Sequence, residues 1–556
     1  MTSVQGESPT EQQGLKNDIL ILTALAGFLF FVSLGARDLW NPNEPIYGRA
    51  VAEMEERGDW LIPTVNGTVF AEKPILYYWG ALAVSKLSGT VNEWSLRVPS
   101  ALAGMASVLL TYLLVVPYVG RRRAMLSAML LMSMYQVWWA SRAVQMDILV
   151  LAASLGVIVP LIRFLDFKTS AAKSFAWAGI AAGLGFAAKG PVAWVVPTIA
   201  LAGYGIFTRR FTHFLRWELG IGVVVAFAVC LPWYGLLLAK GETSFLYEML
   251  FRQNVTRFVD AWDHQQPWWY YLKYLWLDYA PWSWLLPAAF LIRPLEGGEK
   301  KISTFCWVWI CGVIVFFSLS DSKRAPYMLP IAPAAAILVS AVVDRWLLGK
   351  LLERKARIAA SIALSLLAVA MITAGVALFI PAVDLPEGFG FMAIVLGLVM
   401  GVSGMAIGYG VLKTKQHPKL APYSVFGLMF SLFLCASIWI LPAVDSVKSA
   451  RGFATKMINQ IDSSGGTVAS YQFWDWRAGY SYYANRSIPI LKNPKDLQSY
   501  WNEESVPFIL VEEEHAKEVG ELLSDSTIVL EGKIGNTDAF LFSKIGSQSH
   551  FEDQQL

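Results

Sequence analysis

Charged residues are scarce in this chain. They make up 16% of its 556 residues, whereas soluble domains carry about a quarter. Hydrophobic residues reach 55%, so the composition excludes an ordinary soluble enzyme and indicates a polytopic membrane protein. The net charge is only +3, and no nucleic-acid partner is expected.

Cysteine and histidine are also rare. The cysteines are Cys230, Cys306, Cys311 and Cys435. All lie within apolar runs and lack zinc-finger spacing, so we expect buried membrane residues and no disulfide framework. The five histidines are scattered, and no histidine metal cluster is visible. No G-x-G-x-x-G motif follows a strand at either terminus, which argues against a nucleotide-sugar donor.

Long apolar runs, in contrast, are abundant. A membrane-spanning helix needs about 20 apolar residues, and about thirteen candidate spans are present. They cover residues 18–36, 97–118, 125–140, 147–165, 174–188, 192–207, 217–237, 269–292, 302–319, 327–344, 358–380, 389–411 and 422–443. Basic clusters such as Arg121–Arg123 occupy alternate loops, as the positive-inside rule requires when the N-terminus is cytoplasmic. The pattern predicts an all-α polytopic membrane protein.

Three segments then lie on the non-cytoplasmic side: 37–96, 238–268 and 445–556. In the first, 45–57 has apolar residues at helical spacing, and 75–83 is apolar but too short to span. We expect interfacial helices there. The tail alternates helix-like runs with strand-like runs at 467–471, 507–511, 527–530 and 539–542. It predicts a small α/β domain at 445–556, after a transmembrane domain at 1–444.

The first outer loop carries candidate catalytic chemistry. If the substrate is a sugar on a polyisoprenyl phosphate, the phosphate departs without a general acid. The enzyme then needs a carboxylate to orient or deprotonate the acceptor hydroxyl, and a cation for the phosphate. Loop 37–96 supplies Glu44, Glu72 and Lys73. Asp147 begins a span, where an ionisable residue indicates function, although a helix cap is an equal alternative. Lys189, in a Lys-Gly-Pro turn between two spans, either turns the chain or reaches toward phosphate.

Several motifs together resemble one family. They are the run at 37–104 (RDLWNPNEPIY to VPSALAG), Arg142 with Asp147, FAAKGPVAWVVP, HQQPWWYYLKY and SDSKRAPYMLPIAPAAAIL. Their order and spacing over about residues 18–345 resemble the GT-C membrane glycosyltransferases. Within these, the bacterial aminoarabinose transferases and the dolichyl-phosphate-mannose-protein mannosyltransferase-like proteins are most similar. The short tail domain also suits the aminoarabinose transferase pattern.

The resemblance implies a GT-C fold and sugar transfer from a polyisoprenyl-phosphate donor. The implied acceptor is a lipid A-like glycolipid, or another envelope acceptor such as a glycoprotein, at the periplasmic face of a bacterial inner membrane. By resemblance, Asn43 and Glu44 stand at a catalytic acidic pair, and Asp147 at a second acidic position. Glu72 matches a carboxylate linked to metal binding. The basic positions that would contact donor phosphate are Lys73, Arg257, Lys323 and Arg324.

Two departures from the family pattern leave alternatives open. Asn43 cannot be a general base because an amide does not titrate. Gln253 falls where the pattern has a histidine metal ligand, and glutamine is a poor zinc ligand. Either Glu44 or Asp147 serves as base, or the chain uses a divalent metal such as Mg²⁺ in place of Zn²⁺ or none, or catalysis is impaired. A lipid or glycan transporter is the alternative class, but the notable charges lie in outer loops rather than at the membrane midplane.

Overall fold

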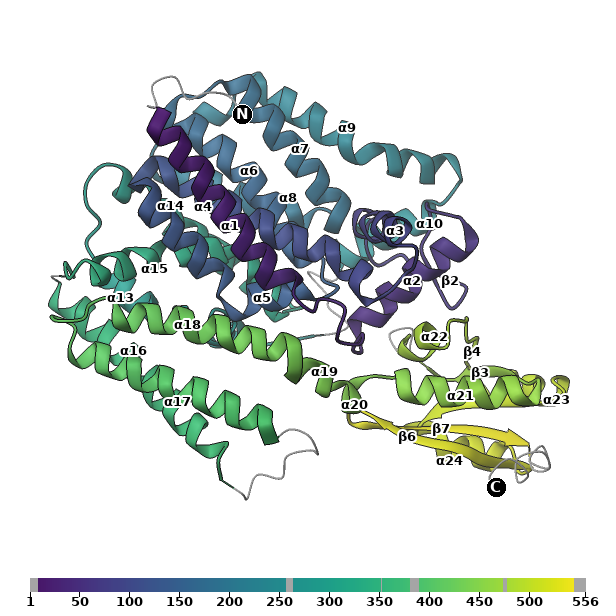
Figure 1. Cartoon of the computed structure of the whole chain (residues 1–556). Coiled ribbons are helices and arrows are strands. Elements are labelled where there is room, and N and C mark those ends of the chain that lie inside the picture. Colours follow the sequence, from purple (N-terminus) through teal and green to yellow (C-terminus); the bar gives the residue numbers. More distant parts are fainter. Residues whose placement is uncertain (1–8, 257–263, 352, 381–389, 474–477, 545–556) are drawn as a thin grey trace. The chain divides into compact units, whose positions relative to one another are not determined.

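The computed structural model of the protein describes residues 9–256, 264–351, 353–380, 390–473 and 478–544 (Figure 1). These residues form two compact units. The first comprises residues 1–34, 72–77 and 97–439, and the second comprises 35–71, 78–96 and 440–556. Each unit is considered by itself. The predicted domain boundary at 444/445 stays a prediction.

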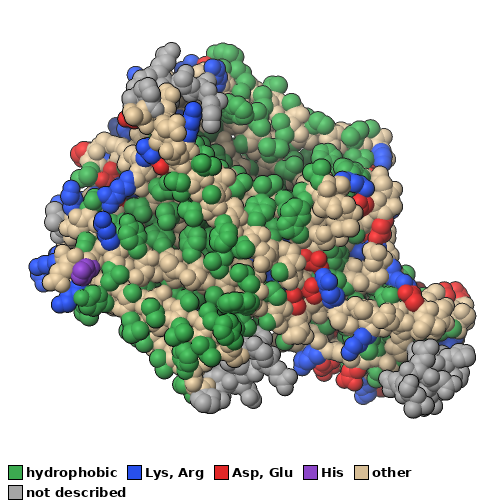
Figure 2. Space-filling model, in the orientation of Figure 1, with side chains coloured by type: hydrophobic (Ala, Val, Ile, Leu, Met, Phe, Trp, Pro, Cys, Tyr) green, Lys and Arg blue, Asp and Glu red, His purple; other side chains and the backbone are tan. Residues whose placement is uncertain are grey.

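Within the described residues, nine helical segments are long and apolar enough to cross a membrane. They are α1 (Pro9–Phe31), α4 (Glu93–Met132), α6 (Asp147–Phe167), α9 (Glu218–Ala239), α14 (Gly298–Ser318), η4 with α15 (Ala325–Leu347), α16 (Arg354–Ala377), α17 (Gly390–Leu412) and α18 with its extension (Leu420–Ala443). Shorter helices of the same unit are α5 (Tyr135–Arg142), α7 (Ala171–Lys189), α8 (Val192–Phe207), α12 (Tyr270–Asp278) and α13 (Leu286–Leu291). Hydrophobic side chains cover much of the visible face of this helical part, as lipid contact requires (Figure 2). The predicted all-α membrane class is confirmed, and the number of spans stays a prediction.

Two predicted spans, 125–140 and 269–292, are each divided in the structure. The runs 97–118 and 125–140 fall on α4 and α5. Helix α4 is interrupted at Gly120, whose φ of 80° only glycine adopts readily, and continues to Met132. The run 269–292 consists of α12, a 3₁₀ turn at Trp282–Leu285 and α13. Pro281 lies directly before that turn, and proline cannot donate the backbone hydrogen bond that a continuous helix needs.

Glycines on α7 allow close packing against α9. A Cβ at Gly179 would lie 2.4 Å from the carbonyl oxygen of Gly222, and one at Gly183 would lie 2.6 Å from that of Ala226. Small residues at such positions let two membrane helices approach backbone to backbone. This contact sets the spacing of the helices around Lys189, the last residue of α7.

The second unit contains the sheet predicted for the tail. Its strands are β3 (Thr467–Tyr471), β4 (Ile490–Leu491), β5 (Pro507–Glu512), β6 (Ser526–Ile534) and β7 (Thr537–Lys544), in the order β4-β3-β5-β7-β6. β3 is parallel to β4 and β5, whereas β7 is antiparallel to β5 and β6. The helices are α21 (Arg451–Ser464), α22 (Gly479–Tyr483), α23 (Pro494–Glu503) and α24 (Glu513–Leu522). Alternating residues of β5, such as Phe508 and Ile509, enter two separate apolar clusters. The predicted α/β domain is confirmed.

Part of the first outer loop belongs to this second unit. It includes α2 (Asn43–Arg57), the short hairpin β1 (Thr64–Val65) and β2 (Thr68–Val69), and most of α3 (Leu76–Ser88). Glu53 of α2 is buried and ties the hairpin to the helix. It accepts hydrogen bonds from Thr64 Oγ1 (2.5 Å) and from the Asn66 amide (2.7 Å), and it pairs with Arg49 (2.9 Å). Buried charges are tolerated when they are paired and hydrogen-bonded in this way.

Candidate functional site

A cavity of about 310 Å³ lies in the first unit. Its charged lining residues are Glu72, Lys73 and Lys189. Its polar ones are Gln253, Asn254, Ser320, Ser322 and Tyr327, and its apolar ones are Pro74, Pro191, Val192, Val195, Phe316 and Phe317. A cavity lined by two lysines and by apolar side chains suits a ligand with an anionic head and a hydrocarbon chain.

Lys189 enters the cavity from the end of α7. Gly190 follows with a φ of 74° and turns the chain into α8, and its amide caps α7 by donating to Phe186 O at 2.7 Å. The Lys189 ammonium lies 2.5 Å from Asp147 Oδ1 and 4.9 Å from the centre of the Tyr327 ring. Both contacts hold it in one place. The two alternatives for Lys189 therefore combine: the motif turns the chain and presents a fixed cation to the cavity.

Asp147 is the first residue of α6, where the helix dipole favours a negative charge. Its carboxylate accepts a hydrogen bond from Lys189. Asp147 thus contacts Lys189, which lines the cavity, and affects the cavity by positioning that lysine. A helix-end role and a role at the site are both compatible with this position.

Lys73 and Glu72 line the cavity just before α3. Lys73 Nζ donates to the Glu72 carbonyl at 3.2 Å and lies 3.8 Å from Glu72 Oε2. The Lys73 side chain is 16% exposed, and that of Glu72 is 43% exposed. The exposed carboxylate is accessible to a substrate, and the partly buried ammonium is favourably placed for an anion because few waters screen it.

Lys323, a predicted phosphate contact, donates its hydrogen bonds to main-chain carbonyls instead. Its Nζ donates to the carbonyl of Gln266 (2.9 Å) and to that of Ser320. Burial lowers the pKa of Lys323, and the nearby Asp321 opposes this shift. Lys323 thereby holds the Ser320–Ser322 turn that lines the cavity. Arg324 precedes the 3₁₀ helix η4 (Ala325–Ile331) and is not among the described lining residues. Arg257 lies outside the described residues.

Asn43 and Glu44 belong to the second unit. Glu44 is buried and receives two hydrogen bonds from Arg37, at 2.5 and 3.0 Å, and one from the Trp40 amide at 3.2 Å. Asn43 is the exposed first residue of α2. The bidentate Arg37 pair makes Glu44 an acceptor that organises the start of the loop.

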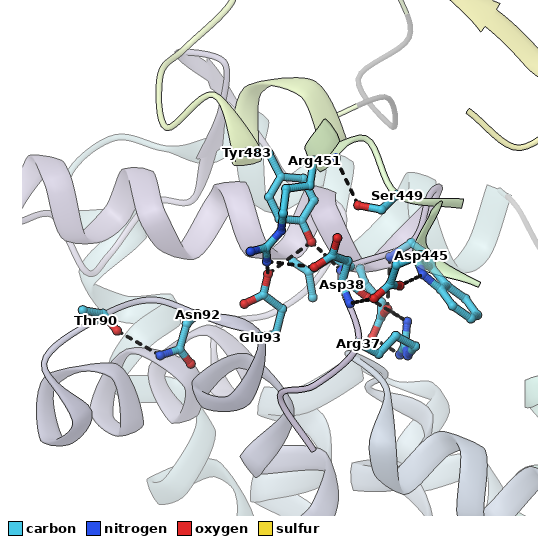
Figure 3. Close-up of polar contacts among 12 residues, drawn as sticks. Arg37, Asp38, Thr90, Asn92, Glu93, Asp445, Ser449, Arg451 and Tyr483 are labelled. Atoms are coloured by element: carbon cyan, nitrogen blue, oxygen red, sulfur yellow. Dashed lines mark hydrogen bonds and ion pairs between the residues drawn. The ribbon is translucent and has the colours of Figure 1, made fainter. Parts of the chain in front are cut away.

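A polar cluster that sequence reasoning missed joins this loop to the tail within the second unit (Figure 3). Arg451 pairs with Asp38 at 2.8 Å and with Glu93. The Asp38 amide donates to Asp445 at 2.9 Å, and Tyr483 donates to Glu93 at 3.2 Å. Burial raises the pKa of Asp445, although the Asp38 amide and Trp40 indole that donate to it oppose the shift. About 400 residues separate these partners in sequence, so no local pattern signals the contact.

The described part of the chain contains no preformed set of metal ligands. There, no three His, Cys, Asp or Glu side chains come close enough together to hold an ion. Beside the cavity, the Gln253 amide donates to Glu248 at 3.1 Å. The described residues therefore do not fit a metal held by three such ligands, and the predicted Zn²⁺ or Mg²⁺ stays untested.

The fold defines the class of protein. This chain is an integral membrane protein with the GT-C fold. The crystal structure of ArnT from Cupriavidus metallidurans bound to undecaprenyl phosphate matches it with a TM-score of 0.75 at 19% sequence identity, covering 94% of this chain and 97% of that chain. The apo structure of the same protein gives a TM-score of 0.74.

Sequence comparison leads to the same group. Residues 72–235 match the family described as dolichyl-phosphate-mannose-protein mannosyltransferase. Undecaprenyl phosphate-alpha-4-amino-4-deoxy-L-arabinose arabinosyl transferase 1 of Pseudomonas fluorescens (strain Pf-5) is 33% identical over 340 residues, which is 60% of each chain. The corresponding transferase of Pseudomonas aeruginosa (strain PAO1) is 31% identical over 361 residues, 63% of this chain and 64% of the relative. The chain thus spans less than two thirds of the length of these relatives. The resemblance to aminoarabinose transferases is confirmed.

Proposed function

We propose that this protein is a glycosyltransferase that moves a sugar from undecaprenyl phosphate to a lipid A-like glycolipid at the periplasmic face of a bacterial inner membrane. The names of its relatives support this activity. The observation that carries the proposal is the cavity where Lys73 and Lys189 meet an apolar wall. Two ammonium groups match a phosphate, and the wall of Val192, Val195 and Phe317 matches the first isoprene units.

The chemistry assigns a role to each group. The acceptor hydroxyl attacks the anomeric carbon, and the bond from that carbon to the phosphate oxygen breaks with its electron pair on the phosphate. Lys73 and Lys189 neutralise the departing phosphate. Glu72 is the predicted carboxylate that itself lines the cavity, and it accepts the hydroxyl proton. Asp147 positions Lys189 through their 2.5 Å ion pair.

The test is transfer of labelled sugar from an undecaprenyl-phosphate-linked aminoarabinose donor to lipid A by protein reconstituted in vesicles. We expect turnover, and we expect Lys73→Ala to reduce kcat/KM by about a hundredfold or more, as removal of a charge-stabilising group does. Lys86→Ala is the matched control, because Lys86 is a half-exposed lysine of the adjoining α3 that pairs with Glu55.

Other outcomes distinguish the alternatives. Movement of the donor lipid across the vesicle without bond cleavage would support a transporter instead. A protein that is inactive as it stands but active after Asn43→Asp would be an impaired relative of these transferases.

A further inference from the structure

A second cavity, of about 370 Å³, lies in the first unit among α6, α7, α8, α9 and the 3₁₀ turn η1 (Phe211–Phe214). Its lining is almost wholly apolar. Small residues of α7, namely Ala178 and Ala182, leave the space open. An apolar cavity of this size in a membrane protein is suited to a hydrocarbon chain.

The cavity opens sideways along α9. Leu219, Val223 and Phe227 line it and are also exposed at the surface of the unit. Trp194, at the start of α8, lies at the end of the cavity remote from η1, where its indole donates to Ala182 O at 2.8 Å and its ring lies 4.6 Å from that of Phe186. A chain in this cavity therefore enters from the bilayer and stops at Trp194.

Helix α8 separates this space from the candidate active site. It presents Trp194, Thr198 and Leu201 to the apolar cavity, and Val192 and Val195 to the cavity that contains Lys73. The two spaces lie on different faces of one helix. A donor whose phosphate binds at Lys73 does not extend its chain into the second cavity without passing through α8.

A linker that lines one end of the second cavity is basic. The linker between α8 and α9 contributes Phe211, Phe214 and Leu215 to its lining and also carries three arginines. Arg210 pairs with Asp166, and Arg216 pairs with Glu218 at 3.0 Å. Arg209 is exposed, with no ion-pair partner among the residues that the structure describes. One cation in excess at the edge of an apolar cavity complements an anionic lipid headgroup.

We propose that this cavity holds one acyl chain of an anionic phospholipid, with the headgroup at Arg209. The lipid comes from the leaflet at the basic ends of α6 to α9. Apolar lining and exclusion of water stabilise the chain, and the charge of Arg209 selects the headgroup. This site is independent of the proposed sugar transfer, and its occupant is a bilayer lipid rather than a substrate.

Native mass spectrometry tests the proposal on full-length protein that has been stripped of lipid and incubated with equal amounts of phosphatidylglycerol and phosphatidylethanolamine of matched chains. We expect one phosphatidylglycerol to be retained, with about a fivefold preference over phosphatidylethanolamine, as one basic residue near the surface provides. Arg209→Gln should remove the preference. Ala202→Phe, which fills the cavity, should abolish retention.

Arg354→Gln is the control, because Arg354 is an exposed arginine at the start of α16. Arg209 is exposed, so its substitution leaves folding intact even if Ala202→Phe does not. Equal retention of both lipids, or retention that Arg209→Gln leaves unchanged, would overturn the proposal. When undecaprenyl phosphate is added to the same mixture, its retention in place of phosphatidylglycerol, lost in Ala202→Phe but not in Lys73→Ala, would also overturn the proposal.

Discussion

The ion pair of Lys189 and Asp147 joins two helix ends that are 42 residues apart in sequence. The pair leaves Lys189 with donors directed to the cavity while Asp147 and the Tyr327 ring fix its position. A fixed cation stabilises a developing phosphate charge without reorganisation, which is how charge contributes most to catalysis.

Asp147→Asn tests this positioning role. The amide still contacts Lys189 but no longer fixes it by charge, so we expect kcat to fall by about ten- to a hundredfold with little change in KM for the acceptor. Steady-state kinetics with each substrate varied in turn checks the split. A purely structural role would instead lower the amount of folded protein and leave kcat per folded molecule unchanged. Asp496→Asn, at an exposed acid of α23 in the second unit, serves as control.

Glu53 gives the second unit a pH-dependent stability. Burial raises the pKa of Glu53, but hydrogen bonds from Thr64 and Gly67 and the charge of Arg49 outweigh burial, so its pKa lies below the ordinary value of 4.5. A lowered folded-state pKa stabilises the fold above the unfolded value, and this contribution is lost as pH falls through the folded value.

Glu53→Gln should therefore lower stability by about 1–3 kcal/mol near pH 7, where a charged acceptor is lost. The difference from the unaltered protein should shrink below about pH 4.5, as Glu53 itself becomes protonated. Thermal unfolding as a function of pH measures this. Glu55→Gln, two residues away on α2 and paired with Lys86 at 3.0 Å, is the control. A constant difference at every pH would show that charge is not the cause.

At the scale of elements, the α7–α9 contact depends on the absence of side chains. We expect Gly183→Ala to destabilise the protein by about 1–3 kcal/mol, because its Cβ would lie 2.6 Å from Ala226 O and the helices must separate. Gly220→Ala is the matched control, since a Cβ there meets nothing within 4 Å. Thermal unfolding in detergent compares the two. Equal melting temperatures would contradict the close-packing account.

At the scale of the whole molecule, one chain builds each unit from remote segments. In the second unit Arg451 of α21 links Asp38 and Glu93 of the first loop to the tail. Arg451→Gln should loosen this link and speed proteolytic cleavage within residues 35–71 by several-fold, because local opening exposes the backbone. Arg486→Gln is the control, as Arg486 forms an ion pair with Asp462 within the tail. Unchanged cleavage of the loop would mean that apolar contacts alone hold it.

Local pattern was enough to predict elements of both units. The run 192–207 has the bounds of α8, and the strand-like runs at 467–471 and 507–511 fall on β3 and β5. The length of an apolar run and the alternation of apolar and polar residues are properties of neighbouring residues, so they can be recognised without knowledge of the fold. The break at Gly120 lies between the predicted spans 97–118 and 125–140. The division of 269–292 was missed, because apolar composition continues across it.

The candidate site was predicted only in part. Glu72 and Lys73 line the cavity as adjacent residues of one motif. Nothing in the sequence ranked Lys189 above Lys323, yet packing brings Lys189 into the cavity and directs the ammonium of Lys323 to main-chain carbonyls. The direction of a long side chain depends on its neighbours in space.

The sequence by itself determined the membrane class and the kind of tail domain, because the hydrophobic effect acts on composition and period that a single segment displays. Tertiary structure alone decided which charges meet. Ion pairs form between Lys189 and Asp147, between Arg37 and Glu44, and between Arg451 and Asp38. The reason is that Coulomb interactions and hydrogen bonds extend only a few ångströms, so they depend on where packing places residues that lie far apart along the chain.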